Sequence, residues 1–391
     1  MSFESVRDRE KSCLAQTYGR YQVALDSGRG ARCVDVEGKK YVDFTSGIGV
    51  NALGYCDEGW VQAVTGQLNK LQHASNLFYT EPMIQAAQML TSRTGMKRVF
   101  FANSGAEANE GAIKAARKYS YDKYGQGRAT ILSLRNSFHG RTVTTLSATG
   151  QDVFHNFFFP FTQGFAYAPA NDIQGTLDML TSDVCAVMME MVQGEGGVVP
   201  LNYDYVQAVA RACAQKDILV IVDEVQTGMG RTGTLFAYEQ FDIAPDLVSS
   251  AKGLGGGLPI GAVLLGEKTQ DTLGLGQHGT TFGGNPVVCA GACEVLRRLD
   301  APFLQGVCQM GAYLRARLEE MPGIEQVTGL GMMLGATLSK GDAKSVSARC
   351  AQNGLLILTA KEKLRLLPPL TLTREDADEG LEILEKTLAS F

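Results

Sequence analysis

The chain has 391 residues, of which 45% are hydrophobic and 20% are charged, and this composition is typical of a folded globular protein with more than one domain. Its net charge of −5 and its lack of a basic run exclude nucleic acid as an expected partner. No apolar stretch approaches the roughly 20 residues that span a bilayer, and the polar N-terminal segment does not resemble a secretory signal. The nine cysteines form no CxxC pair and no cluster with histidine, so we expect reduced thiols, no metal and a cytoplasmic location.

Strand-like and helix-like segments alternate through the first two thirds of the chain. The expected strands are 97–102, 129–134, 184–190, 218–222, 246–251 and 259–266, and the expected helices are 105–119 and 205–215. This order predicts an α/β fold with a mainly parallel, doubly wound sheet. In such sheets, ligands bind at the carboxyl ends of the strands.

The character of the sequence changes after Asn285-Pro286. Residues 287–320 have the pattern of two helices, and mixed strand and helix patterns follow to the C-terminus. We therefore expect three parts, which are an N-terminal segment (1–50) that packs with a small domain, a large cofactor-binding domain (51–286) and the small domain itself (287–391).

An acid and a lysine stand at two of the expected strand ends. The apolar run 218–222 ends in Asp223, and Lys252 follows the next strand and precedes the glycine-rich run 253–257. A lysine in such surroundings is poorly placed for a solvated helix face, but it is well placed where another body approaches the backbone. A Schiff-base lysine with an aspartate partner for a pyridinium nitrogen is the arrangement that pyridoxal phosphate (PLP) requires, and we expect this cofactor.

A polar motif with small residues, Ser104-Gly105-Ala106-Glu107, follows the strand 97–102 and opens a helix. Ser104 is expected to cap this helix and Glu107 to complete a capping box. Taken alone, the motif indicates no more than that cap. Free N–H groups at a helix N-terminus also bind phosphate, and small side chains leave room for an anion, so beside the acid and the lysine we expect a phosphate site here.

Four other features could contact a ligand. Phe138 could stack on a cofactor ring and Arg141 could bind a carboxylate through two hydrogen bonds, although core packing and a surface charge are the common roles of such residues. Arg365 lies in an apolar run and needs a partner, either a protein acid such as Glu195 or a bound carboxylate. The segment GMGRTG (228–233) matches a dinucleotide-binding pattern, but no helical pattern opens directly after it, so we interpret it as a loop.

These residues lie in longer motifs that resemble those of the class-III, fold-type-I PLP-dependent aminotransferases. The resemblance covers nearly the whole chain and is carried by SNLFYTEP (75–82), FANSGAEANEGAIKAARKY (101–119), SFHGRT (137–142), QGEGGVVP (193–200), DEVQTGMGRTG (223–233), SAKGLGGGLPIGAV (250–263), HGTTFGGNP (278–286) and RLLPPL (365–370). It implies a large doubly wound domain with a smaller α/β domain formed by both termini, ping-pong transfer of an amine through PLP, and at least a homodimer.

The resemblance also implies a role for each matching residue. Lys252 would hold the cofactor as a Schiff base and later move a proton, and Asp223 would pair with the pyridinium nitrogen. The other implied cofactor contacts are Ser104, Gly105, Ala106, Phe138, Glu224, Val225, Gln226 and, from the neighbouring subunit, Thr281. The implied substrate contacts are Arg141 for the α-carboxylate of N-acetylornithine, Arg365 for that of glutamate or 2-oxoglutarate, Glu195 to neutralise Arg365, and Thr280.

Within this family, the chain most resembles the enzymes that act on N-acetylornithine in arginine biosynthesis, and we expect that donor. Related ornithine aminotransferases have a tyrosine where Ile48 stands, and an apolar side chain there suits an acylated α-nitrogen but also suits 4-aminobutyrate. Succinylornithine, ornithine and 4-aminobutyrate remain alternative donors. The chain departs from the family pattern in GYCDEGW (54–60) and at Met191. From other classes, the alternatives are a nicotinamide oxidoreductase built on 228–233 and a non-catalytic regulator.

Overall fold

The computed structural model describes all 391 residues, and its largest element is a seven-stranded sheet. In spatial order its strands are β4 (Arg98–Ala102), β12 (Gly261–Leu265), β11 (Leu247–Ser250), β10 (Leu219–Asp223), β7 (Val184–Met189), β5 (Thr130–Leu134) and β6 (Phe165–Ala168). Neighbours are parallel except that β12 runs antiparallel to β11 and β4. The predicted mainly parallel sheet is confirmed, and all six predicted strands are present within two residues of their expected bounds, whereas β6 was not predicted.

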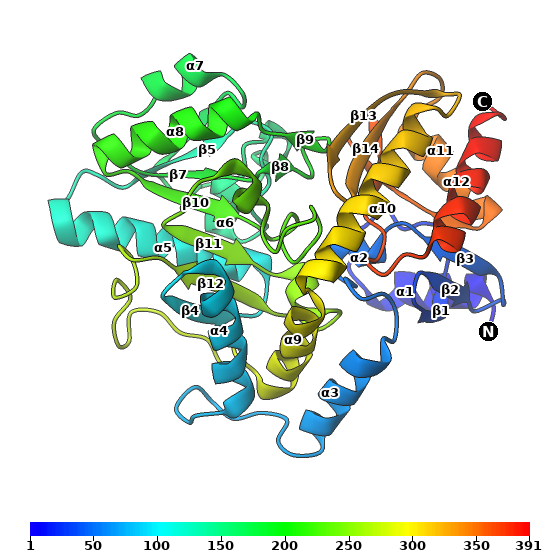
Figure 1. Cartoon of the computed structure of the whole chain (residues 1–391), viewed down its shortest axis with the longest axis horizontal. Coiled ribbons are helices and arrows are strands. Elements are labelled where there is room, and N and C mark those ends of the chain that lie inside the picture. Colours follow the sequence, from blue (N-terminus) through cyan, green and yellow to red (C-terminus); the bar gives the residue numbers. More distant parts are fainter.

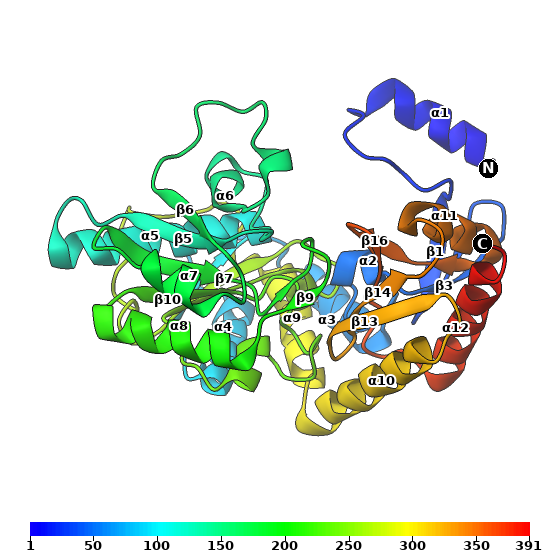
Figure 2. The same ribbon diagram turned by 90° about the horizontal axis from the view of Figure 1, so that it is seen from above.

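Helices cover both faces of this sheet (Figure 2). On one face, α5 (Gly105–Tyr124) buries small and apolar side chains such as Ala112 and Ile113 against the strands. The other face is covered by α8 (Tyr203–Lys216), on which α7 (Ile173–Asp178) packs in turn. Because β7 and β10 are buried along their whole length, they consist almost entirely of apolar residues.

The C-terminal third of the chain forms a smaller unit beside the large sheet (Figure 1). Its antiparallel sheet has the order β13 (Ile324–Leu330), β14 (Met333–Leu338), β17 (Lys363–Leu366) and β16 (Leu358–Ala360), and its helices are α10 (Ala301–Glu319), α11 (Ala343–Asn353) and α12 (Arg374–Leu388). A second small sheet joins the two ends of the chain, with the order β1 (Leu25–Arg29), β2 (Arg32–Asp35), β3 (Lys40–Asp43) and β15 (Leu355–Leu356). The smaller domain is thus built from both termini, as predicted.

Three helices pack against one another beside the large sheet. The contacts of α9 (Pro286–Arg298) are with α3 (Glu58–Leu68) and α4 (Glu81–Thr94), which belong to the large unit. We therefore propose that the division between the domains lies after α9 rather than at residue 286.

The remaining elements are short or peripheral and comprise α1 (Phe3–Cys13), α2 (Ser46–Gly49), α6 (Val143–Ala148), η1 (Asp152–Phe154), η2 (Ala237–Phe241), η3 (Lys252–Gly255), β8 (Val192–Gln193) and β9 (Val199–Pro200). No helix is both long and apolar enough to cross a membrane.

The segment 228–233 is a buried loop of the large unit that contacts the small unit. Arg231 is only 2% exposed, and it donates hydrogen bonds to the backbone carbonyl oxygens of Met332 (3.3 Å) and Pro368 and to the Ser46 hydroxyl (3.4 Å). Burial lowers the pKa of Arg231 to about 9. One side chain therefore joins three parts of the chain that are far apart in sequence, which is a structural role for a motif that resembles a dinucleotide loop.

Replacement of Arg231 by methionine keeps most of the side-chain volume but removes every one of these hydrogen-bond donors. We expect the free energy of unfolding to fall by about 3 kcal/mol, because buried carbonyl groups lose their partners. Urea denaturation measures this change. The matched control is Arg349→Met on α11, where the arginine is exposed and a change below about 0.5 kcal/mol is expected. Equal stabilities of the two variants would contradict the role of Arg231.

Candidate active site

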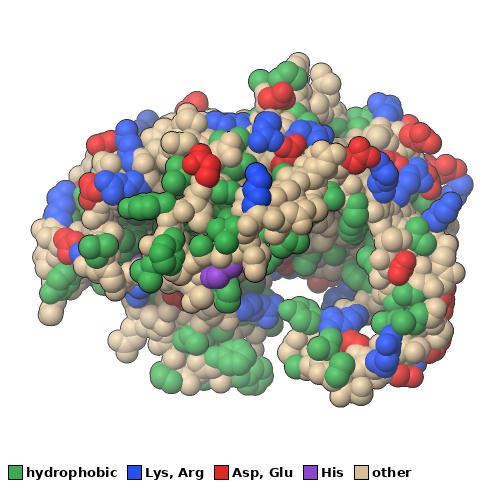
Figure 3. Space-filling model, turned by 90° about the horizontal axis from the view of Figure 1, so that it is seen from below, with side chains coloured by type: hydrophobic (Ala, Val, Ile, Leu, Met, Phe, Trp, Pro, Cys, Tyr) green, Lys and Arg blue, Asp and Glu red, His purple; other side chains and the backbone are tan.

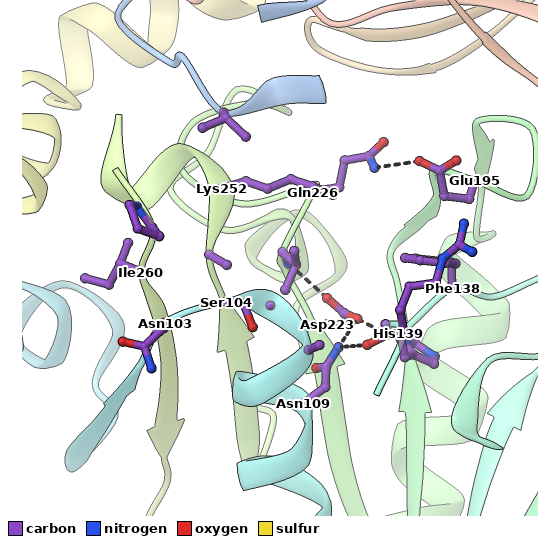
Figure 4. Close-up of a pocket in the computed structure, with 18 of the residues that line it drawn as sticks. Asn103, Ser104, Asn109, Phe138, His139, Glu195, Asp223, Gln226, Lys252 and Ile260 are labelled. Carbon is purple, nitrogen blue, oxygen red and sulfur yellow. Dashed lines mark hydrogen bonds and ion pairs between the residues drawn. The ribbon is translucent and has the colours of Figure 1, made fainter. Parts of the chain in front are cut away.

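A cavity of about 630 Å³ opens where the carboxyl ends of β4, β5, β7, β10 and β11 meet (Figure 4). This volume is typical of a site for a small molecule. Most of the predicted site residues line it, and these are Ser104, Gly105, Ala106, Phe138, Arg141, Glu195, Asp223, Val225, Gln226 and Lys252. Residues that line it without a predicted role include Tyr18, Val50, Asn109, His139, Glu190 and Ile260.

Asp223, the last residue of β10, is held by three hydrogen-bond donors. Its Oδ2 accepts from Asn109 Nδ2 and lies 2.8 Å from His139 Nδ1, and its Oδ1 accepts from the backbone N–H of Val225. Only 3% of the residue is exposed. Each donor bonds to one of the carboxylate oxygens, so this acid is oriented to accept a hydrogen bond from a protonated ring nitrogen placed against it.

The N-terminus of α5 points at the cavity, as Figure 4 shows at Ser104. Ser104 caps the helix, because its hydroxyl accepts the backbone N–H of Glu107 at 3.2 Å. The predicted capping box is wrong by one residue, since the Glu107 carboxylate accepts from the backbone and side-chain N–H groups of Asn103 rather than from Ser104. Gly105 leaves no room for a side chain, because a Cβ there would lie 2.7 Å from Val225. The free N–H groups and the small residues make this helix end suitable for an anion.

Lys252 stands in η3 directly after β11, with its backbone in the left-handed region at φ 43°. Its side chain extends into the cavity toward Gln226 (Figure 4) and its amine makes no hydrogen bond to the protein. Burial lowers the pKa of this amine, although the Glu195 carboxylate opposes the shift. A lysine with these properties is a candidate nucleophile and proton carrier.

Arg365 and Glu195, whose contact the sequence could not establish, form an ion pair of 2.5 Å between Nη1 and Oε1. Arg365 is only 3% exposed, and the same Nη1 lies 3.3 Å from the side-chain oxygen of Gln226. Burial opposes the charge on Glu195, but the attraction of Arg365 outweighs it and lowers the pKa of the carboxyl group. Glu195 and Gln226 line the cavity, and Arg365 lies behind them.

Phe138 and Arg141 follow β5 and line the cavity, and Figure 4 shows Phe138 on the opposite side from the Lys252 loop. The backbone N–H of Phe138 donates to Glu190, whose other oxygen accepts the backbone N–H of Gly194. Glu190 is fully buried, and burial raises the pKa of its carboxyl group. It therefore braces the two loops that carry Phe138 and Glu195.

Five residues named from the sequence do not line this cavity. Glu224 points into the following turn, where its carboxylate accepts from the Thr227 hydroxyl and the backbone N–H of Tyr238. Thr280 and Thr281 lie on the loop after β12, and the Thr280 hydroxyl accepts a hydrogen bond from Asn103, which itself lines the cavity. Arg365 reaches the cavity only through its partners Glu195 and Gln226. Ile48 is 44% exposed and also lies outside the cavity wall.

The residues that sequence reasoning missed carried detectable signals. Glu190 is an acid directly after the buried strand β7, and this is the pattern that identified Asp223 after β10. Asn109 is the one amide among the small residues on the inner face of the first turns of α5. His139 directly follows Phe138 in the SFHGRT motif, and its ring supports Asp223.

Comparisons with known proteins agree with this geometry. The family described as "Aminotransferase class-III" matches residues 13–388. An acetylornithine aminotransferase of Haemophilus ducreyi is 52% identical, with 100% of both chains covered. Among solved structures, the N-acetylornithine aminotransferase of Stenotrophomonas maltophilia K279a is 39% identical with a TM-score of 0.84, covering 98% of each chain. The ornithine aminotransferase of Toxoplasma gondii, which contains PLP at partial occupancy in its active site, is 30% identical with a TM-score of 0.95, covering 100% of this chain and 94% of that one.

The environment of Glu224 predicts a pH-dependent stability. Burial raises the pKa of this carboxyl group from 4.5 to about 7, so its contribution to stability is complete below pH 4.5 and is lost as the pH rises through 7. We expect this loss to approach about 3 kcal/mol. Glu224→Gln mimics the protonated acid and should remove this part of the pH dependence in urea denaturation at pH 5.5, 7 and 8.5. An unchanged pH slope in the variant would contradict the assignment.

Proposed function

The chain belongs to the class-III aminotransferase family, and we propose that it transfers the ω-amine of N-acetylornithine to 2-oxoglutarate, giving N-acetylglutamate semialdehyde and glutamate. The observation that carries the proposal is the cavity itself, in which a half-buried lysine, a hydrogen-bonded aspartate and a free helix N-terminus converge. We place the reaction in arginine biosynthesis and the protein in the cytoplasm.

The residues of the cavity fit PLP. The α5 N-terminus with Ser104, Gly105 and Ala106 would hold the phosphate, and Asp223 would hold the ring nitrogen. Phe138 would pack on the ring face, and Lys252 would bind the cofactor covalently. When bound, PLP supplies an electron sink for the negative charge left when a proton leaves the carbon that bears the amine.

The chain's own residues supply binding and proton transfer. Burial lowers the pKa of the Lys252 amine, which favours its action as a base, so its Nζ can take a proton from the donor carbon and return it elsewhere in the same cavity. The three hydrogen-bond donors of Asp223 keep this carboxylate oriented throughout the cycle. Glu190 keeps the Phe138 loop in place.

The ion pair of Arg365 with Glu195 accounts for the use of two different substrates by one site. A buried cation without a partner costs several kcal/mol, and Glu195 supplies the partner while an ω-amine donor is bound. When 2-oxoglutarate arrives, its α-carboxylate takes the place of Glu195 on Arg365. Glu195 is about one third exposed at its side chain and can move away from the pair without being buried elsewhere.

A second copy of the chain would complete the site, and we propose a homodimer. Two loops expose large hydrophobic residues to solvent, which are Leu77, Phe78, Tyr79, Leu275 and Phe282. Figure 3 views the molecule from below and shows hydrophobic side chains in several patches on this face. Apolar side chains exposed together are typical of protein interfaces. Thr281 lies beside Phe282 on this loop, is exposed, and is therefore placed to reach a partner's phosphate site.

The donor can be tested in a half-reaction without an acceptor. N-acetylornithine, ornithine and 4-aminobutyrate are added separately to the PLP-loaded protein, and loss of the visible absorption of the bound cofactor is followed. We expect fast loss with N-acetylornithine and a rate lower by at least about 100-fold with the other two, because only the first has both an α-carboxylate and an acylated nitrogen. Lys252→Ala should abolish turnover. Faster loss with ornithine or 4-aminobutyrate would overturn the donor, and activity of the alanine variant would overturn the mechanism.

Arg141→Met tests the donor's carboxylate site separately. Loss of a charged hydrogen-bonding partner should raise KM for N-acetylornithine by about 10- to 100-fold. PLP content and KM for 2-oxoglutarate should stay as in the unchanged protein, because Arg365 serves the acceptor. An unchanged KM for the donor would contradict the role of Arg141.

A further inference from the structure

Arg141 is a cation that has no anionic partner in the protein. Its side chain is exposed at the cavity mouth and forms no hydrogen bond and no ion pair with the rest of the chain. Its contacts are instead with two aromatic rings. The guanidinium carbon lies 4.6 Å from the ring centre of Phe154 and 5.6 Å from that of Phe138. These distances are those of cation–π contacts.

Aromatic faces suit a cation that must bind a carboxylate. A free arginine side chain has many rotamers, and ordering it when the substrate arrives costs binding free energy. A protein carboxylate would order it but would compete with the substrate for the same N–H groups. A ring face orders the guanidinium plane and leaves its N–H edge free for two parallel hydrogen bonds.

Phe154 is itself held firmly enough for this role. It ends η1 in the segment between α6 and β6, which projects from the body of the molecule (Figure 2), and it is only partly exposed. Its ring packs edge-on against Phe138 with the centres 5.7 Å apart. Hydrogen bonds tie the chain on both sides of it, since Gln151 donates to the Ser137 carbonyl oxygen and His155 Nε2 lies 2.9 Å from that of Leu146.

We propose that Phe154 is a positioning residue, which holds the Arg141 guanidinium over the cavity so that the site selects donors with an α-carboxylate. The inference rests on the proposed function, because it assumes that Arg141 binds the carboxylate of the donor. It adds a residue from a projecting loop to the elements that determine donor choice. Phe154 acts through Arg141 and does not touch the reacting atoms.

The test compares two donors that differ in the carboxylate alone, N-acetylornithine and N-acetylputrescine. In the unchanged protein, KM should be much lower for N-acetylornithine. Phe154→Leu keeps the apolar volume but removes the ring face, and we expect KM for N-acetylornithine to rise about 3- to 20-fold. KM for N-acetylputrescine, KM for 2-oxoglutarate and kcat should stay within about twofold. Phe154→Tyr keeps a ring face and should restore the low KM.

The matched control is Phe157→Leu, the same change in the same loop at a residue that is 83% exposed and lies away from Arg141. It should leave KM for N-acetylornithine unchanged. An unchanged KM in Phe154→Leu, or an equal rise for both donors, would overturn the positioning role. Failure of the unchanged protein to distinguish the two donors would instead overturn the proposed role of Arg141, so the two failures are separable.

Discussion

The charged groups of the active site are stabilised by ion pairing with one another and by a few hydrogen bonds, which offset the free-energy cost of burying them. Glu195 is stable as an anion because Arg365 lies beside it, and Asp223 is stable because three donors surround one carboxylate. These groups come from different strands and from the small unit, so no local segment could hold them alone. The sheet order and the docking of the C-terminal sheet are therefore conditions for the chemistry.

Much of the architecture could be predicted because its signals are local. The strands of the large sheet are short apolar runs between turns, and their burial on both faces explains that composition. Asp223 and Lys252 stood out because each breaks such a pattern at a strand end. The one reversed strand, β12, carries the same apolar pattern as its parallel neighbours, and its direction depends on where the chain passes between strands.

The remaining features depend on contacts between distant residues. Glu195 and Arg365 are 170 positions apart, and only the docking of β17 next to the large unit brings them together. Glu107 bonds to Asn103 because that residue, just past the end of β4, offers two N–H donors. In the sequence, Arg231 stands in a segment that resembles a dinucleotide-binding loop. Its structural role becomes evident only from its carbonyl partners in the small unit. Side chains that act in the site by packing, such as Phe154, are not marked by any sequence motif.

The pairing of β3 with β15 has a consequence for synthesis of the protein. Val42 lies opposite Leu355, so the first sheet of the chain is completed only after about 310 further residues have been made. At ribosomal rates this delay is roughly 15 to 60 s, during which Tyr41, Val42 and Phe44 lack the partners that bury them. Throughout this delay, the edge of β3 that will pair with β15 therefore has no hydrogen-bonding partner.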